Sequence, residues 1–192
     1  MRIHTILGTT IALTATFTGV AVPFAEAIQL ANGTVAFVRS PHLIAASTTF
    51  NEAYAWGATY YFTVELPENI GEPLGMVKIQ QREGFETIRF NLEESFVFEG
   101  KHRHKGDKLA IVEVTEDKET KTISLTFDPP ISPGKIVTIG LRPVRNPIDG
   151  IYLFGVAAFP AGEKPYGLYL GVGRLHFYDD FDRHFPFIDL WR

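Results

Sequence analysis

Alternating hydrophobic and polar positions dominate the chain after its first 27 residues. The clearest alternation covers residues 60–66, where one set of side chains is apolar: Tyr60, Phe62, Val64 and Leu66. A period of two is typical of a β-strand that turns one face toward a hydrophobic core. The same period recurs in residues 77–79, 88–92, 123–127 and 137–141. These segments predict strands, each with one buried face.

Two further segments, residues 109–114 and 168–172, have apolar residues at both odd and even positions. They therefore predict strands that are buried on both faces. Turn residues separate the strands at the spacing of a sandwich. The charged residues 116–119 predict a solvated hairpin tip, and the prolines of residues 128–134 predict an edge or corner. Helices are expected only as short elements, in residues 50–55 and 72–76.

This pattern predicts an all-β fold, an antiparallel two-sheet sandwich of immunoglobulin-like type with one or two short helices. A closed barrel is the alternative. The chain contains no cysteine, so its stability must come from packing, to which 16 phenylalanines contribute. Thiolate metal sites and thiol catalysis are excluded for the same reason.

The first 27 residues have the features of a secretory signal peptide. A basic start at Arg2 leads into an apolar segment, and Ala25 and Ala27 provide the small-x-small pattern that signal peptidase cleaves. We therefore expect three parts: a signal peptide at 1–27, a β-sandwich domain at 28–178 and an aromatic, acidic C-terminal tail at 179–192. The mature chain is expected in the periplasm or outside the cell, without a transmembrane segment.

The charge balance gives no reason to expect a nucleic-acid partner. The net charge is -4, and the leader holds one basic and one acidic residue, so the mature chain keeps this value. No phosphate-binding glycine loop precedes a helical pattern, and we expect no cofactor. The adjacent Glu93 and Glu94 would point to opposite faces of a strand, and no serine lies in a nucleophile-elbow context, so no enzyme activity is expected.

Several long segments resemble one known family. They are residues 56–62, 66–74, 137–147, 152–163 and 170–178, beginning with Trp-Gly-Ala-Thr-Tyr-Tyr-Phe at 56–62. The chain resembles a cyanobacterial family of secreted proteins known as a domain of unknown function, over about residues 40–178. The resemblance implies export and a single globular domain, and it assigns no catalytic residue. The histidine-rich segment near residue 103 and the tail after Tyr178 depart from the family's pattern.

The pentad from Lys101 to Lys105 carries the most specific side-chain chemistry of the sequence. In an extended segment His102 and His104 would project from one side, as a copper, zinc or nickel site requires. Three permanently charged cations flank the two histidines, and their charge disfavours the binding of a divalent metal ion. There are two alternatives to a metal site: the pentad contacts an anion or an acidic glycan, or it forms a solvated loop.

A second polar set lies in apolar, Pro- and Gly-rich sequence: Arg142, Arg145, Asn146, Asp149 and Arg174. One hypothesis is a hydrogen-bonded brace between loops. The other is a recognition site for an anionic or sugar ligand, in which the arginines donate and Tyr152 or Tyr169 stacks.

These features together predict an exported, non-catalytic β-sandwich protein of the cell envelope with a binding or structural role. Its expected partners are an envelope protein or a glycan. The alternative is a carrier, either of a metal ion through His102 and His104 or of an anionic glycan through Arg142, Arg145, Asn146, Arg174 and Tyr152.

Overall fold

The computed structural model describes residues 28–29 and 33–179. The predicted signal peptide, with Ala25 and Ala27, and the predicted tail after Asp179 lie outside these residues. The described part of the chain holds no helix with the length and hydropathy needed to cross a membrane.

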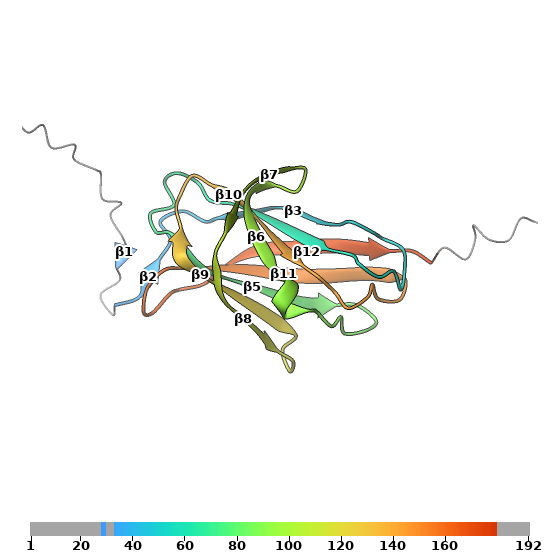
Figure 1. The fold of residues 1–192 in the computed structure, drawn as a ribbon. Coiled ribbons are helices and arrows are strands. Elements are labelled where there is room, and N and C mark those ends of the chain that lie inside the picture. Colours follow the sequence, from blue (N-terminus) through green and yellow to red (C-terminus); the bar gives the residue numbers. More distant parts are fainter. Residues whose placement is uncertain (1–27, 30–32, 180–192) are drawn as a thin grey trace, which may run out of the picture.

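Two five-stranded antiparallel sheets make up the described chain (Figure 1). The first sheet has the order β3-β4-β10-β6-β7, with bounds His42–Thr48, Tyr60–Glu65, Ile136–Leu141, Phe96–Lys101 and His104–Leu109. The second has the order β12-β11-β5-β9-β8, with bounds Leu168–Phe177, Gly150–Pro160, Leu74–Glu83, Thr122–Ile131 and Ile111–Asp117. A separate two-stranded sheet consists of β1 (Ile28–Gln29) and β2 (Val35–Ala36), and Val35 bridges to Pro165 in the β11–β12 connection. The all-β, two-sheet prediction is confirmed, and the described strands do not close into one barrel.

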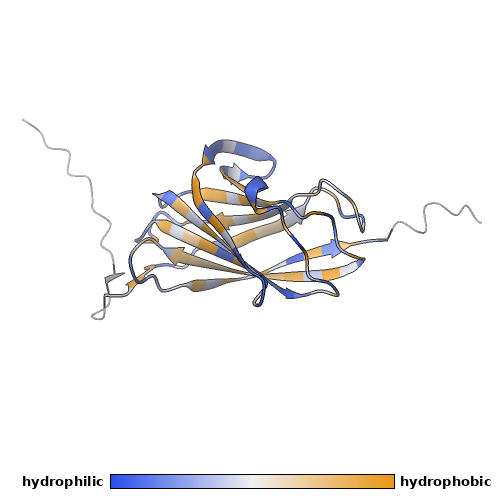
Figure 2. Cartoon of the chain, turned by 60° about the horizontal axis from the view of Figure 1, so that its bottom comes forward, coloured by the Kyte–Doolittle hydropathy of each residue, from blue (hydrophilic) through white to orange (hydrophobic). Residues whose placement is uncertain are grey.

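The core lies between the two sheets and is built from the alternating positions. Strand β4 contributes Phe62 and Val64, its neighbour β10 contributes Ile139, and Leu125 and Phe154 come from the second sheet. All five are buried, and Figure 2 shows the hydrophobic stripes along the strands. At about 25 cal/mol per Å² of apolar surface removed from water, this burial is the main stabilising contribution in a chain without cysteine.

The two predicted helices are wrong. Residues 50–55 form turns, held by a bridge between Glu52 and Tyr178. Residues 72–76 contain Pro73 and Gly75 and lead directly into β5, where Leu74 pairs with Ile131. A single 3-10 turn, η1 (Leu92–Glu94), is the helical element of the described chain.

The two segments expected to be buried on both faces are instead edge strands. The chain leaves the first sheet after Leu109 and enters the second at Ile111, so residues 109–114 lie at the edges of both sheets. The side chain of Val112 is 61% exposed, and Val172 on the edge strand β12 is 47% exposed. Burial on both faces requires a central place in a sheet, which a short apolar run does not reveal.

Strand β4 is buried on its second face as well, which its alternating pattern does not predict. Tyr61 is only 5% exposed and Thr63 is equally enclosed, although both point away from the core between the sheets. The hairpin formed by β6 and β7 covers them. On the neighbouring β10, Gly140 has no side chain, and the Phe96 ring occupies the space where a Cβ atom would lie.

Candidate functional site

The β6–β7 hairpin brings the histidine-rich pentad together. Lys101 and His104 are paired, which leaves His102 and Arg103 at the tip of the turn. Gly100 makes this geometry accessible, because its φ is +98° and a Cβ atom at this position would overlap the carbonyl oxygen of His104. The expected extended segment is therefore wrong: the pentad is bent at its centre.

The tip of the hairpin folds back onto the outer face of the first sheet. The ring of His102 stacks on that of Tyr61, with centroids 4.0 Å apart and planes inclined by 15°. The Lys105 ammonium lies 5.8 Å from the Tyr61 ring centroid and 5.5 Å from that of Phe98. These contacts are of cation–π type and keep the basic hairpin against an aromatic surface.

Two threonines anchor the hairpin from beneath. The hydroxyl of Thr138 donates to the carbonyl oxygen of Gly100 over 2.6 Å, and the hydroxyls of Thr63 and Thr138 lie 2.9 Å apart. Both side chains are buried, so each hydrogen bond compensates for a polar group removed from water. The turn is thus held at a fixed position above β4 and β10.

A pocket of about 420 Å³ opens between this hairpin and strand β3. Its titratable lining residues are all basic and consecutive in sequence: Lys101, His102, Arg103 and His104. Ser47, Thr48 and Thr63 complete its polar lining, and none of the described lining residues carries a carboxylate. The Thr48 hydroxyl donates to the Phe50 carbonyl oxygen and the Thr63 hydroxyl pairs with that of Thr138, so the basic side chains are the main donors left for a ligand. Such donors favour an oxyanion such as a carboxylate, sulfate or phosphate.

The imidazole of His102 is partly enclosed by the pocket wall and the neighbouring cations. Burial lowers the pKa of His102, and the charges of Lys105 and Arg103 lower it further. Its Nδ1 atom is enclosed and has no hydrogen-bond partner among the described residues. A bound anion would offset the two cations and favour the charged imidazole.

The described residues contain no group of three His, Cys, Asp or Glu side chains arranged to hold a metal ion. His102 and His104 share the pocket with two permanent cations, Lys101 and Arg103. Their electrostatic field opposes a dication, so the pocket suits an anion better than a metal.

The second predicted set, around Arg142 and Arg145, is divided among separate environments. Arg142 pairs with Glu94 over 2.9 Å, and both side chains are half exposed. The Arg145 guanidinium lies 3.5 Å from Glu86 and 4.9 Å from the Tyr54 ring centroid. These arginines therefore have intramolecular partners.

Asn146 is fully buried and forms the brace between loops that the sequence suggested. Its Nδ2 donates to the carbonyl oxygens of Phe50 and Glu52 over 3.0 and 2.9 Å, and its Oδ1 accepts from the Tyr60 hydroxyl over 3.0 Å. The side chain has no surface left for a ligand.

Tyr152 is also inside the core, with its ring 5.6 Å from that of Phe177, and burial raises the pKa of its hydroxyl. Its predicted role as a stacking surface is wrong, because the ring is inaccessible. Tyr169 is 53% exposed, and the Arg82 guanidinium lies 5.6 Å from its centroid. Arg174 is exposed on the same strand, β12, opposite Leu153 of β11.

Sequence reasoning found the basic half of the pocket and missed the other half. Ser47, Thr48 and Thr63 come from strands some 40 to 55 residues earlier in the chain, and no local motif marks them. Tyr61, which stacks on His102, belongs to the set of β4 side chains that the alternation does not place in the core between the sheets.

Residues 34–177, well over half of the 192-residue chain, match the family model described as "Protein of unknown function (DUF2808)". The chain belongs to this family. The DUF2808 match includes the hairpin and the whole of both sheets up to the end of β12. No curated protein matches the chain.

Solved structures of low identity are also similar to this DUF2808 chain. The C-terminal domain of the Streptococcus pyogenes antigen I/II-family protein AspA is 16% identical, with a TM-score of 0.40, covering 69% of this chain and 46% of that one. The collagen adhesin CNA from S. aureus is 10% identical, with a TM-score of 0.38, covering 62% of this chain and 44% of that one. This chain thus spans less than half the length of either structure. The bacterial hydrophobin BslA is 16% identical, with a TM-score of 0.37, covering 69% of this chain and 98% of that one.

Proposed function

We propose that this protein is an exported, non-catalytic binding protein of the cell envelope, with an immunoglobulin-like sandwich as its scaffold. Its ligand is an acidic glycan whose anionic groups enter the pocket beneath the β6–β7 hairpin. One observation carries the proposal: four consecutive basic side chains line a single pocket, and none of the described lining residues carries a carboxylate.

The rigidity of the hairpin supports a binding role. The buried Thr138 and the stacked Tyr61 hold the turn in place before any ligand arrives. A fixed turn loses less conformational entropy on binding than a flexible loop that carries the same basic side chains. The overall charge is -4, so the basic hairpin provides a local attraction that the molecule as a whole lacks.

The binding test compares a charged sugar with its neutral counterpart. We expect tetragalacturonate to bind in a calorimetric titration, and its fully methyl-esterified form to bind at least tenfold more weakly, because esterification removes the anionic groups. The variant Lys101→Gln/Arg103→Gln should lose about tenfold in affinity. Equal affinities for the acid and the ester would contradict the proposal.

The matched control is Arg39→Gln/Lys164→Gln, which removes the same total charge at exposed positions outside the pocket. Its affinity for tetragalacturonate should stay within about twofold of the parent chain, since distant surface charges are screened. If both double variants weaken binding equally, the attraction is a property of the net charge and the pocket is not the site.

Export rests on the predicted signal peptide at 1–27. When the full chain is produced in a cell with a secretory pathway, the mass of the protein outside the cytoplasmic membrane should match an N-terminus near Ile28. A product that retains Met1 and remains in the cytosol would contradict export without affecting the binding test.

A further inference from the structure

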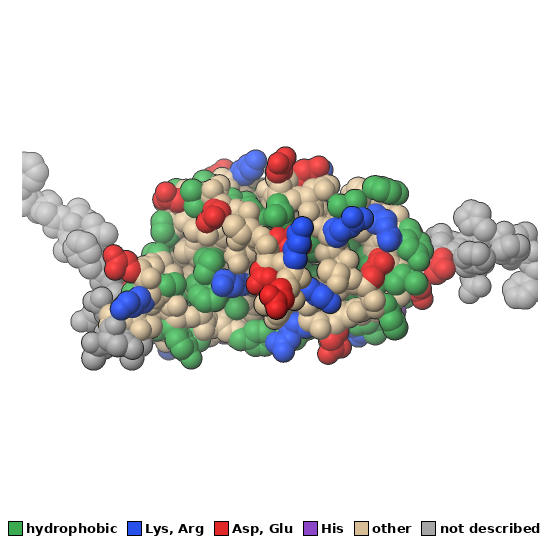
Figure 3. Space-filling model, turned by 90° about the horizontal axis from the view of Figure 1, so that it is seen from below, with side chains coloured by type: hydrophobic (Ala, Val, Ile, Leu, Met, Phe, Trp, Pro, Cys, Tyr) green, Lys and Arg blue, Asp and Glu red, His purple; other side chains and the backbone are tan. Residues whose placement is uncertain are grey.

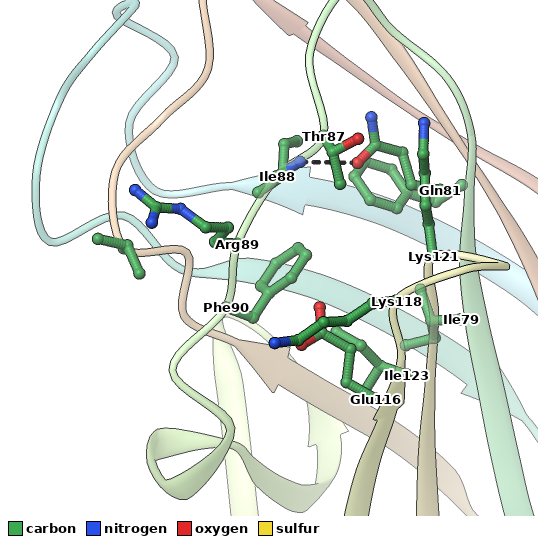
Figure 4. Close-up of a pocket in the computed structure, with 12 residues that line it drawn as sticks. Ile79, Gln81, Thr87, Ile88, Arg89, Phe90, Glu116, Lys118, Lys121 and Ile123 are labelled. Atoms are coloured by element: carbon green, nitrogen blue, oxygen red, sulfur yellow. Dashed lines mark hydrogen bonds between the residues drawn. The ribbon is translucent and has the colours of Figure 1, made fainter.

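A second concave site lies in the second sheet, away from the hairpin pocket. It is a cleft of about 380 Å³ between strands β5 and β9 and the segment 87–90 that follows β5. Its floor is apolar and includes Ile79, Ile88, Phe90 and Ile123 (Figure 4). Phe154 of the core also lines it. Small-ligand sites typically have volumes of roughly 300 to 1,000 Å³ and predominantly apolar linings.

The wall of the cleft is fixed by a single buried side chain. Gln81 accepts a hydrogen bond from the Ile88 amide over 2.9 Å, drawn as a dashed line in Figure 4, and donates to the Glu86 carbonyl oxygen over 2.6 Å. Farther along, the Val144 amide donates to the Arg89 carbonyl oxygen over 2.8 Å. The cleft is therefore preformed rather than created by a flexible loop.

Two lysines stand at the mouth of the cleft. Lys118 and Lys121 belong to the β8–β9 turn, and neither forms an ion pair with another described residue. In Figure 4 the side chain of Lys118 extends toward Phe90, and that of Lys121 rises beside Gln81. Arg89, which also contributes to the lining, turns its guanidinium away from the cleft.

Neither lysine lies within ion-pair distance of an acidic side chain of the described residues, although the end of β8 and the turn after it carry Glu116, Asp117 and Glu119. Glu116 is the one carboxylate among the lining residues. The neighbouring Asp117 accepts from the amides of Glu119 and Thr120 over 2.9 and 3.2 Å, and these bonds lower its pKa. Its carboxylate thus shapes the turn. The wider surface on the β8 side carries interspersed cationic and acidic side chains (Figure 3), so the lysines form a local feature.

We propose that this cleft binds a monomeric amphipathic carboxylate, such as a medium-chain fatty acid. The alkyl chain lies on the apolar floor, and the carboxylate lies at the mouth, where the long side chain of Lys118 or of Lys121 turns to pair with it. Charge complementarity selects the head group, and the apolar floor selects the chain. The site shares no lining residue with the hairpin pocket, so the two proposals stand or fall separately.

The test is a titration of the isotopically labelled full chain with sodium octanoate below its micelle-forming concentration, followed by amide NMR. We expect shift changes at residues 79–81, 87–90 and 118–123. Hexanoate, shorter by two methylenes, should bind about fifteenfold more weakly, since each buried methylene contributes about fourfold. Neutral 1-octanol should also bind at least tenfold more weakly than octanoate.

The variant Lys118→Ala/Lys121→Ala should lose about tenfold or more in octanoate affinity. Both lysines are exposed turn residues, so the variant should fold like the parent. The control is Lys164→Ala, an exposed lysine of the β11–β12 connection that should leave the affinity unchanged.

Three results would overturn the proposal: no saturable shift at the cleft, equal affinity for octanol and octanoate, or equal octanoate affinity in the double variant and the control. Shifts confined to residues 44–48 and 101–104 would place the carboxylate in the hairpin pocket, which would overturn the cleft while supporting the proposed function.

Discussion

Asn146 is the polar side chain on which one end of the sandwich depends most. It satisfies two loop carbonyl oxygens and the hydroxyl of the buried Tyr60 at once. Replacing Asn146 with alanine would leave these groups without partners in the interior. We expect Asn146→Ala to lower the free energy of unfolding by about 3 kcal/mol, measured by urea denaturation.

Asn91 provides the matched control for this substitution. It is exposed and its side chain makes no capping hydrogen bond to η1, so Asn91→Ala should change the free energy of unfolding by less than about 0.5 kcal/mol. If Asn146→Ala is no more destabilising than Asn91→Ala, the brace does not hold the loops together.

The titration of His102 is a second prediction at the level of one residue. Burial and the neighbouring Lys105 and Arg103 hold its pKa below the usual histidine value of 6.5. The unfolded chain therefore binds this proton more tightly, so the stability contributed by neutral His102 is present above pH 6.5 and is lost as the pH falls through the folded-state pKa.

Proton NMR of the His102 ring measures this pKa directly. Lys105→Gln removes one of the two charges and should raise the pKa of His102, and so should saturation with tetragalacturonate. Lys164→Gln, which is remote from the hairpin, should leave it unchanged. A pKa above 6.5 in the unliganded parent chain would contradict the enclosed geometry of this imidazole.

Sequence alone identified some functional residues and misplaced others for a physical reason. The pentad stood out because like charges at consecutive positions are unfavourable unless solvent or a ligand compensates for them. Tyr152 was misplaced because a tyrosine in an apolar strand fits a surface or a core equally well. Its burial depends on packing against Phe177, more than twenty residues away.

At the level of elements, the β6–β7 hairpin depends on Gly100. Both the positive φ and the nearby His104 carbonyl oxygen exclude a side chain there. Gly171 also has a positive φ, +127°, but nothing lies within 4 Å of its Cβ position. We expect Gly171→Ala to cost about 1 kcal/mol from backbone strain alone, and Gly100→Ala to cost at least about 2 kcal/mol more.

Thermal denaturation of the two variants checks this difference, and the ring signals of Tyr61 report whether His102 still stacks on it. The stacking should be lost in Gly100→Ala and kept in Gly171→Ala. Equal destabilisation, with stacking intact in both, would show that the close approach at Gly100 does not set the hairpin.

The hydrophobic pattern of the sequence predicts the burial of some strands correctly and of others wrongly. Strand β9 follows its alternation over residues 122–127, because one face of it packs on the core, whereas β4 and β10 are buried on both faces. The pattern failed at residues 109–114, since a run that passes from one sheet edge to another has the same composition as a central strand. It failed again at residues 72–76, where pairing of Leu74 with Ile131 outweighs a weak local preference for helix.

For the whole molecule, the two-sheet class was predictable but the order of strands was not. In the second sheet β5 lies between β9 and β11, and these contacts join segments more than 40 residues apart. No local signal encodes such pairing. The pocket could not be predicted from the sequence for the same reason. Its hydroxyl groups come from β3 and β4, and its cations come from the hairpin between β6 and β7.

The proposed function requires that β3, β4 and the basic hairpin surround one anion site. An amide NMR titration of the full chain with tetragalacturonate locates this site. We expect saturable shift changes that cluster at residues 44–48, 61–63 and 100–105, weaken with added salt and vanish in Lys101→Gln/Arg103→Gln. Shift changes of equal size that map to the outer face of β11 and β12, around Tyr169 and Arg174, and persist in that variant would contradict it.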